Sequence, residues 1–251
     1  MKRVLLRIAY EGTAYSGFQI QPNAPTIQEA VEKAILQVTG EKTEIMGGSR
    51  TDAGVHALWN VAVFDTNSPI PGEKFCYALN GHLPEDIRIL ASVEVPEDFH
   101  PRKCDSTKTY RYQIETGRIY NPLQKNFYHF TYQGLDVEAM QKAAKYIEGT
   151  HDFKSFCSAG AQVSTTVRTV YEVRVEKEEE KVLITVKGNG FLYNMVRIIA
   201  GTLMEVGYGR LAPEKLPEII EAKNREAAGP TAPAKGLILL RYDIDNMPGI
   251  L

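Results

Sequence analysis

The sequence has few cysteines, no long hydrophobic run and no excess of basic charge, and each absence excludes a class of protein. Its three cysteines, Cys76, Cys104 and Cys157, are far apart and form no CxxC pair. The sequence therefore predicts neither a disulfide framework nor a zinc site, and reduced thiols in a cytoplasm are the simplest interpretation. No apolar run approaches the ~20 residues that span a bilayer. We do not expect the N-terminal MKRVLLRIAYEG to be a signal peptide, because Arg7 and Glu11 interrupt it and no cleavage site follows.

The formal net charge of −2 over 251 residues means that a nucleic-acid partner would have to be held by local positive charge. Two stretches could supply it. Residues 2–7 contain three basic side chains and no acid, and residues 100–112, HPRKCDSTKTYRY, contain four against the single acid Asp105. For each stretch alone, a solvated strand face is the simpler interpretation.

The first half of the chain predicts the element order β-α-β-β-α-β. Thr26-Ile27-Gln28-Glu29 is a capping box, and apolar residues at helical spacing follow it until Gly40 ends the helix. Besides this helix, the pattern predicts strands at 2–10, 43–47, 58–65 and 86–95 and a second helix at 72–82.

The second half predicts a similar order with one additional helix. Asp136 is the expected N-cap of a helix over 136–148, and the charged EKEEEK is the solvated turn of a hairpin. The other predicted elements are strands at 106–115, 167–176, 181–187 and 236–243 and helices at 191–206 and 213–223.

These orders indicate an α+β fold built from two pseudo-repeated ferredoxin-like halves, each with an antiparallel sheet and helices on one face. We expect an N-terminal half over 1–100, which carries a glycine-rich loop with a lone acid, and a C-terminal half over 101–251. Two such sheets flanking a central cleft would leave room for a substrate.

The glycine-rich loop, GGSRTDAGVHA at 47–57, is the first candidate site. Its glycines and alanines let a ligand approach the backbone around Asp52. The alternative is an Asx-turn or a helix cap, which the loop alone favours. His56 lies four residues after Asp52, and a structural role is the simpler interpretation for it and for His151.

Arg197 is the only charge in the first three turns of the very apolar helix predicted at 191–206. A buried guanidinium needs an acidic partner unless it reaches solvent. None lies within helical reach, so the partner must come from elsewhere, and Asp52 is a good candidate. The pair would keep Asp52 ionised, because a nearby cation favours the charged form of a carboxylate.

Thr-Tyr-Arg-Tyr at 109–112 places Tyr110 and Tyr112 on one face of a strand and Arg111 on the other. The tyrosines could simply be core residues. The functional alternative is a ring that stacks on a base beside basic residues that hold phosphate.

Taken together, five segments resemble the tRNA pseudouridine synthase A family. GGSRTDAGVHA resembles its catalytic motif, and the others resemble its N-terminal, tyrosine, mid-chain and arginine motifs: YEGTAYSGFQIQP at 10–22, FHPRKCDSTKTYRY at 99–112, HDFKSF at 151–156 and GNGFLYNMVR at 188–197. The matches occur in the family's order along the whole chain.

The resemblance implies isomerisation of uridine to pseudouridine at tRNA positions 38, 39 and 40 in the anticodon stem-loop, by a cytoplasmic homodimer that needs neither cofactor nor metal. It implies that Asp52 is the nucleophile, that Arg197 pairs with it, that Tyr110 stacks on the target base and that Arg50 helps to hold the extruded nucleotide. Whether Asp52 attacks the sugar, attacks C6 of the base or removes a proton at C2′ stays open. The group that moves the C5 proton is also unassigned, with Tyr110 as a candidate.

Two other functions fit parts of the sequence. An aspartic hydrolase is suggested by Asp-Ala-Gly, but that class needs a second acid in a second motif copy, and none occurs. A non-catalytic RNA-binding module would explain the basic tyrosine strand but not an ionised lone acid. The substitution Asp52→Asn separates the two functions, because an enzyme would lose turnover while keeping tRNA binding, whereas a binding module would be unaffected.

Overall fold

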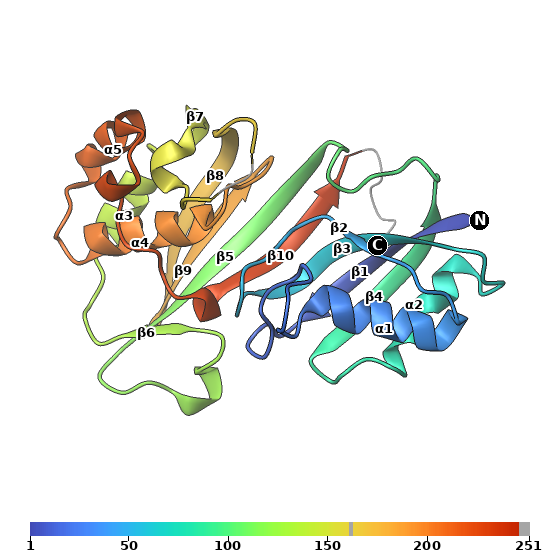
Figure 1. Cartoon of the computed structure of the whole chain (residues 1–251). Helices are drawn as coiled ribbons and strands as arrows, with labels where there is room; N and C mark the ends of the chain where they lie inside the picture. The colour runs from blue at the N-terminus through green and yellow to red at the C-terminus, as the bar shows by residue number, and fades with distance from the viewer. Residues whose placement is uncertain (161–162, 246–251) are drawn as a thin grey trace. The chain divides into compact units, whose positions relative to one another are not determined.

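The computed structural model describes residues 1–160 and 163–245, which form two compact units (Figure 1). Unit 1 comprises Met1–Ser106 and the end of the chain from Leu239 onwards, and unit 2 comprises Thr107–Ile238. Each unit combines a mostly antiparallel sheet with helices, so the α+β class is confirmed. The ferredoxin-like pseudo-repeat stays a prediction.

The sheet of unit 1 has its long strands in the order β4-β1-β3-β10, and the short β2 pairs with β3. β1 pairs antiparallel with both neighbours, and Leu6 stands opposite Ala62 on β3 and Ser92 on β4. The bounds are β1 Lys2–Tyr10, β2 Met46–Gly47, β3 His56–Thr66, β4 Ile87–Val95 and β10 Leu237–Ile244. The predicted strands are therefore found, although the second is shorter than expected.

Two helices cover one face of the unit 1 sheet (Figure 1): α1, Ile27–Thr39, and α2, Phe75–Asn80, which follows a 3-10 turn at Gly72–Lys74. The capping box is confirmed at its first residue, because Glu29 N–H donates to Thr26 Oγ1 at 3.3 Å. Gly40 ends α1 with a φ of 73°, a left-handed conformation in which a side chain would be strained.

The sheet of unit 2 has the order β5-β9-β8-β7, and β6 pairs in parallel with β5. The predicted hairpin is confirmed, with Glu179 at φ 54° in its turn. Sequence patterning missed β6 and β7, which are only three and four residues long. The bounds are β5 Ser106–Thr116, β6 His129–Thr131, β7 Gly149–Asp152, β8 Val167–Glu178 and β9 Lys181–Gly188.

The helices of unit 2 are α3, Val137–Ala144, α4, Met195–Gly207, and α5, Leu216–Ala222. The predicted N-cap of α3 is confirmed, because Ala139 N–H donates to Asp136 Oδ1 at 2.9 Å. The predicted start of α4 at residue 191 is wrong. Asn194 has a φ of 61°, which lies outside the right-handed helical region, so α4 begins at the following residue. Short 3-10 turns occupy Pro122–Gln124, Phe153–Phe156, Pro213–Lys215, Arg225–Ala227 and Ala234–Gly236.

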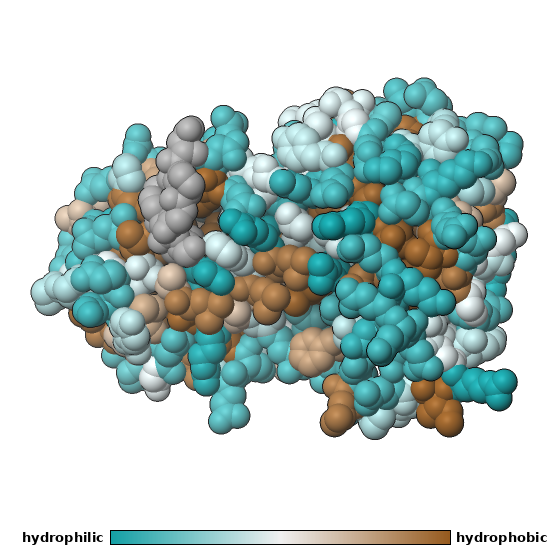
Figure 2. Space-filling model, turned by 180° about the vertical axis from the view of Figure 1, so that it is seen from behind, coloured by the Kyte–Doolittle hydropathy of each residue, from teal (hydrophilic) through white to brown (hydrophobic). Residues whose placement is uncertain are grey.

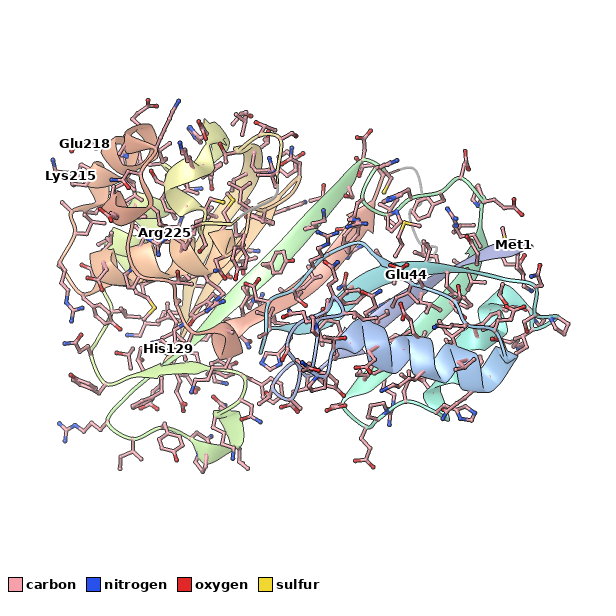
Figure 3. The ribbon with its side chains drawn as sticks, viewed as in Figure 1. Met1, Glu44, His129, Lys215, Glu218 and Arg225 are labelled. Carbon is pink, nitrogen blue, oxygen red and sulfur yellow. The ribbon has the colours of Figure 1, made fainter. Side chains whose placement is uncertain are left out.

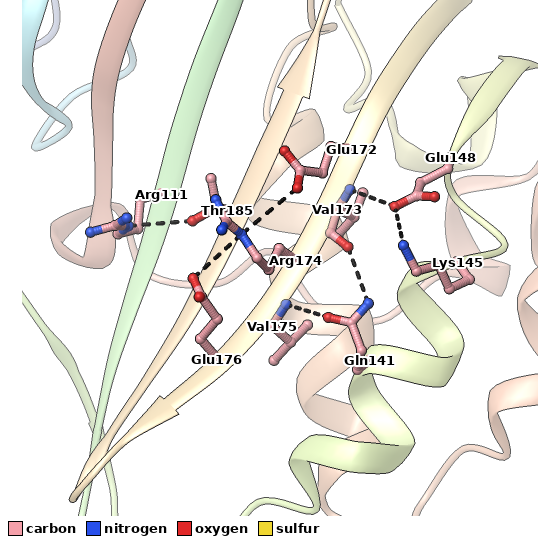
Figure 4. Close-up of polar contacts among 10 residues, drawn as sticks. All are labelled: Arg111, Gln141, Lys145, Glu148, Glu172, Val173, Arg174, Val175, Glu176 and Thr185. Atoms are coloured by element: carbon pink, nitrogen blue, oxygen red, sulfur yellow. Dashed lines mark hydrogen bonds and ion pairs between the residues drawn. The ribbon is translucent and has the colours of Figure 1, made fainter.

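Side chains from α3 and the turn after it satisfy the backbone of β8 beyond the stretch that pairs with β7 (Figure 4). Gln141 accepts from Val175 N–H at 2.6 Å and donates to Val173 O at 3.3 Å, and Glu148 accepts from Val173 N–H at 3.0 Å. Burial alone would raise the pKa of Glu148, but the bonds from Val173 N–H and Lys145 outweigh it and lower that pKa. These contacts protect an edge strand from pairing with another chain.

The core of unit 1 lies on both faces of its sheet. On the face turned away from α1 and α2, Leu5, Val61, Val63, Val95 and Tyr242 form a buried cluster. Viewed from this side, hydrophobic residues are visible among hydrophilic ones (Figure 2). The two packed faces fix β3, and with it the loop that carries Asp52.

Candidate active site

The Asp52 loop connects β2 to β3 and alternates buried with accessible side chains. Ser49 and Thr51 are buried, at 6% and 7% exposure, whereas Arg50 is exposed and Asp52 is half-buried. The two hydroxyl residues thus anchor the loop, and the two charged residues are carried on a fixed backbone. The structure places both Arg50 and Asp52 in this loop, as the sequence predicted.

A buried polar network holds the loop from below. The hydroxyls of Tyr10 and Thr51 are 2.7 Å apart, and Asn60 Nδ2 donates to Tyr10 Oη at 3.1 Å and to Ser49 O at 2.9 Å. Asn60 Oδ1 also accepts from Ser49 N–H at 3.2 Å. Burial raises the pKa of Tyr10 to about 12, so its hydroxyl stays protonated near neutral pH. Such a fully bonded network favours one loop conformation.

The segment that follows β1 packs closely on the same loop. Phe18 N–H donates to Thr51 O at 3.1 Å, and Gly54 N–H donates to Tyr15 O at 3.2 Å. A Cβ on Gly12 would lie 2.0 Å from Val55 O, so only glycine permits this approach. The predicted N-terminal motif at 10–22 and the predicted catalytic motif at 47–57 therefore pack directly against each other.

The two histidines singled out in the sequence both have structural contacts. His56 is 1% exposed, and its Nδ1 accepts from Gly12 N–H at 3.0 Å. His151 Nε2 lies 2.9 Å from Glu148 O. These contacts support a structural role for both residues over a role in chemistry.

Positive charge gathers beside the Asp52 loop within unit 1. Burial lowers the pKa of the Arg102 guanidinium, and the charge of Arg50 lowers it further. Burial also lowers the pKa of His100, and the charges of Arg102 and Lys103 add to that effect. The start of the basic stretch at 100–112, with Arg102 and Lys103, thus contributes to a field that favours an anionic group such as a phosphate.

In unit 2, Tyr110 on β5 packs against the segment that precedes α4. Its ring meets that of Phe191 edge-on, with centroids 5.4 Å apart and an interplanar angle of 89°. Tyr110 is 8% exposed and Tyr112 is fully buried, so both lie on the inner face of the strand as their spacing predicted. Phe191 therefore lies directly beside the predicted stacking residue.

Arg197 lies in the first turn of α4, and its side chain is held by two neutral acceptors. Its Nε donates to Ala232 O and its Nη1 donates to Asn194 Oδ1, both at 2.8 Å. Burial raises the pKa of Tyr112, and the charge of Arg197 partly offsets that rise. The Tyr112 hydroxyl donates to Pro233 O at 2.9 Å, and Pro233 directly follows Ala232, whose O accepts from Arg197 Nε. Unit 2 therefore brings the tyrosine strand and Arg197 together.

The four predicted site residues thus fall into two pairs: Arg50 and Asp52 in unit 1, and Tyr110 and Arg197 in unit 2. The pairing of Asp52 with Arg197 stays a prediction. Sequence reasoning missed the supporting residues Tyr10, Asn60 and Asn194. A lone asparagine in the apolar strand LWNVAVFD was a signal for Asn60, because a buried amide needs partners.

The described residues contain neither a candidate metal site nor a candidate membrane span. Between residues 1 and 160 and between 163 and 245, no three His, Cys, Asp or Glu side chains converge where they could hold a metal ion. Within the same ranges, none of the helices has the length and apolar character needed to cross a membrane.

Comparison with known proteins identifies relatives along nearly the whole chain. A family model described as tRNA pseudouridine synthase matches residues 7–102 and 143–244. The tRNA pseudouridine synthase A of Acetivibrio thermocellus is 51% identical over 241 residues, which are 96% of this chain and 98% of the relative. The tRNA pseudouridine synthase A 2 of Clostridium tetani is 50% identical over 240 residues, or 95% of this chain and 97% of the relative.

A solved structure of a Cbf5–Nop10–Gar1 complex contains a chain that is 13% identical with a TM-score of 0.34, covering 80% of this chain and 54% of that one. A similarity of this size does not bear on function.

Proposed function

Because the chain belongs to the tRNA pseudouridine synthase family and is therefore an isomerase that acts on tRNA, we propose that it converts uridine to pseudouridine at positions 38, 39 and 40 of the anticodon stem-loop, with Asp52 as the nucleophile and without a cofactor. As the family resemblance implies, we expect it to act as a homodimer in the cytoplasm.

The reaction leaves the net composition of the substrate unchanged. The C1′–N1 bond of the uridine breaks and its electron pair stays on the uracil. The uracil turns, C5 forms a new bond to C1′, and the proton on C5 is removed while N1 is protonated. Whether Asp52 attacks the sugar, attacks C6 or removes a proton at C2′, its carboxylate must be ionised.

The observation that carries the proposal is the construction of the Asp52 loop. Buried Ser49 and Thr51 fix its backbone through Tyr10 and Asn60, while Asp52 itself is only half-buried. A nucleophile must be held in a narrow range of positions to react, and this network provides such support. We propose that Arg197 pairs with Asp52 and keeps it ionised.

Tyr110 and Arg50 have separate proposed roles in holding the target nucleotide outside its stack. Extrusion of a base from a stacked stem costs a few kcal/mol. Stacking on an aromatic ring returns about 1–3 kcal/mol, and the ring of Tyr110, which meets Phe191 edge-on, is proposed to make this contact. Arg50 is exposed and shares a positive field with Arg102, which suits contact with a phosphate.

The test uses an unmodified tRNA transcript with uridine at positions 38, 39 and 40. After incubation with the protein, carbodiimide treatment and primer extension should give stops at these positions. Asp52→Asn should abolish the stops while tRNA binding is retained. Asp98→Asn is a matched control, because Asp98 is an exposed acid of unit 1, and it should leave the stops unchanged.

The alternative outcomes are informative. Absence of stops with the unsubstituted protein would refute the proposed function. Stops elsewhere in the tRNA would refute the anticodon positions but not the chemistry. If the unsubstituted protein binds tRNA without forming pseudouridine, it is a binding module.

A further inference from the structure

Asn194 adopts a strained backbone conformation next to Arg197. Its φ of 61° and ψ of 6° are left-handed, a region that asparagine tolerates better than other non-glycine residues but at some cost. It occupies the N-cap position of α4, where an asparagine side chain ordinarily accepts a bond from the helix backbone. It makes no such capping bond here.

The Asn194 side chain binds two other side chains instead. Its Oδ1 accepts from Arg197 Nη1 at 2.8 Å, and its Nδ2 donates to Ser158 Oγ at 2.9 Å. Ser158 is itself anchored, because its N–H donates to Tyr193 O at 3.1 Å. The amide is thus clamped at its nitrogen and presents its oxygen to the guanidinium.

The segment before β10 holds Arg197 from a second direction. Ala232 O accepts from Arg197 Nε at 2.8 Å, and Ala232 N–H donates to Arg197 O at 3.1 Å. Pro233 O accepts from the hydroxyl of the buried Tyr112 at 2.9 Å. Arg225, which lies near α4 in Figure 3, binds Gly229 O at 2.9 Å and so shapes the same segment.

These contacts fix the plane of the guanidinium. A bond at Nε alone would still allow motion of the side chain about that bond, whereas a second bond at Nη1 resists rotation about Nε–Cζ. Both acceptors are neutral, so neither cancels the positive charge of Arg197. An arginine that must meet a carboxylate in one geometry benefits from such orientation.

We propose that Asn194 is a positioning residue, which sets the plane in which Arg197 meets the carboxylate of Asp52. The inference rests on the proposed function for its catalytic consequence, although the orientation itself can be measured separately. It also explains why α4 begins only at Met195. The left-handed conformation of Asn194 places its side-chain amide beside Arg197, three residues later, so this amide does not cap the helix.

The main variant is Asn194→Gly. Glycine adopts a left-handed conformation without strain, so the fold should be kept, and the relief of strain should offset part of the stability lost with the two side-chain hydrogen bonds. The turnover number should fall by at least about tenfold, because a displaced catalytic group can cost ~100-fold. The KM for tRNA should change by less than about threefold, since Asn194 is not proposed to bind RNA. Asn23→Gly is the matched control: it is also a left-handed asparagine, at φ 59°, but is exposed in unit 1, and its turnover should be unchanged.

A double variant tests whether Asn194 acts through Arg197. Arg197→Ala should lose most of the activity, and adding Asn194→Gly to it should cause no further loss, because the two residues act as one unit. An additional loss in the double variant would overturn the proposal, as would full turnover in Asn194→Gly.

An NMR measurement tests orientation without any substrate. Rotation of the Arg197 guanidinium about Nε–Cζ should be slow in the unsubstituted protein and at least about threefold faster in Asn194→Gly and in Ser158→Ala, with the resonances assigned by their loss in Arg197→Ala. An unchanged rotation rate in Asn194→Gly would overturn the proposal whatever the activity. An unsubstituted protein that shows slow rotation but forms no pseudouridine would instead refute the proposed function alone.

Discussion

Substitution of Gly201 by alanine should displace the segment that holds Arg197. Gly201 lies inside α4, and a Cβ at this position would be 1.8 Å from Pro230 O. To reach 3.0 Å, below which such contacts essentially do not occur, the two must separate by roughly 1.2 Å (3.0 − 1.8). The nearest obstacle is backbone, so the whole segment must move.

The magnitude follows from the bonds that this movement breaks. Three connect the segment to α4: Arg197 Nε to Ala232 O at 2.8 Å, Ala232 N–H to Arg197 O at 3.1 Å, and Gly229 N–H to Thr202 Oγ1 at 2.9 Å. At about 1 kcal/mol each, their loss outweighs the ~1 kcal/mol that alanine gains over glycine in a helix. We therefore expect a net destabilisation of about 2 kcal/mol, or a Tm lower by about 4–8 °C.

Thermal unfolding followed by circular dichroism measures the stability, and hydrogen exchange at Ala232 N–H reports the displaced segment directly. Turnover should fall as well, because Arg197 loses the bond from its Nε to Ala232 O. Gly134→Ala is the matched control in unit 2, since nothing lies within 4 Å of a Cβ there. A Gly201→Ala protein that is more stable, with unchanged exchange at Ala232, would refute the reasoning.

Two further predictions concern charge in unit 1. Arg3 donates to both oxygens of Asp65 at 2.7 Å and lowers the pKa of that carboxyl. The pair therefore stabilises the fold fully above the pKa of about 3.9 that Asp65 has in the unfolded chain. This stabilisation is lost as the pH falls through the lower pKa of the folded state. Asp65→Asn should lower the free energy of unfolding by about 1 kcal/mol or less at neutral pH. This difference in stability from the unsubstituted protein should narrow below about pH 4, and the fluorescence of the single tryptophan, which lies in β3, can follow the unfolding. A difference in stability that stays constant with pH would contradict the role assigned to the pair. Arg102→Gln should reduce the slope of log affinity for tRNA against log salt concentration by roughly 0.7–0.9, because one phosphate contact is lost. Lys177→Gln, in the acidic hairpin, is the control and should leave that slope unchanged. Equal slopes for Arg102→Gln and the unsubstituted protein would exclude a phosphate contact by Arg102.

Local signals in the sequence predicted most of the individual elements. The capping box at Thr26 and the N-cap Asp136 fixed two helix starts correctly, because capping depends on residues close together in the chain. The start of α4 was misjudged because the apolar pattern continues from Phe191 through the left-handed Asn194, and hydrophobicity carries no information about φ.

Long-range pairing was much less predictable. The sequence patterning does not show that β10, the last strand, lies beside β3. The candidate residues Asp52 and Arg197 could be named from a lone acid in a glycine-rich loop and an arginine with no acid within helical reach in the sequence, together with the family resemblance. Their supports could not, because Asn60 reaches Tyr10 and Asn194 reaches Ser158 across 50 and 36 positions of sequence.

The most direct test of the central claim is tritium release from C5 of uridine in a tRNA labelled at that position, measured in a single turnover. Formation of the C5–C1′ bond requires loss of the C5 hydrogen, so release reports the isomerisation itself. The account predicts release by the unsubstituted protein, and none by an Asp52→Asn protein that binds the same tRNA equally well. Release at an undiminished rate by Asp52→Asn would contradict the account.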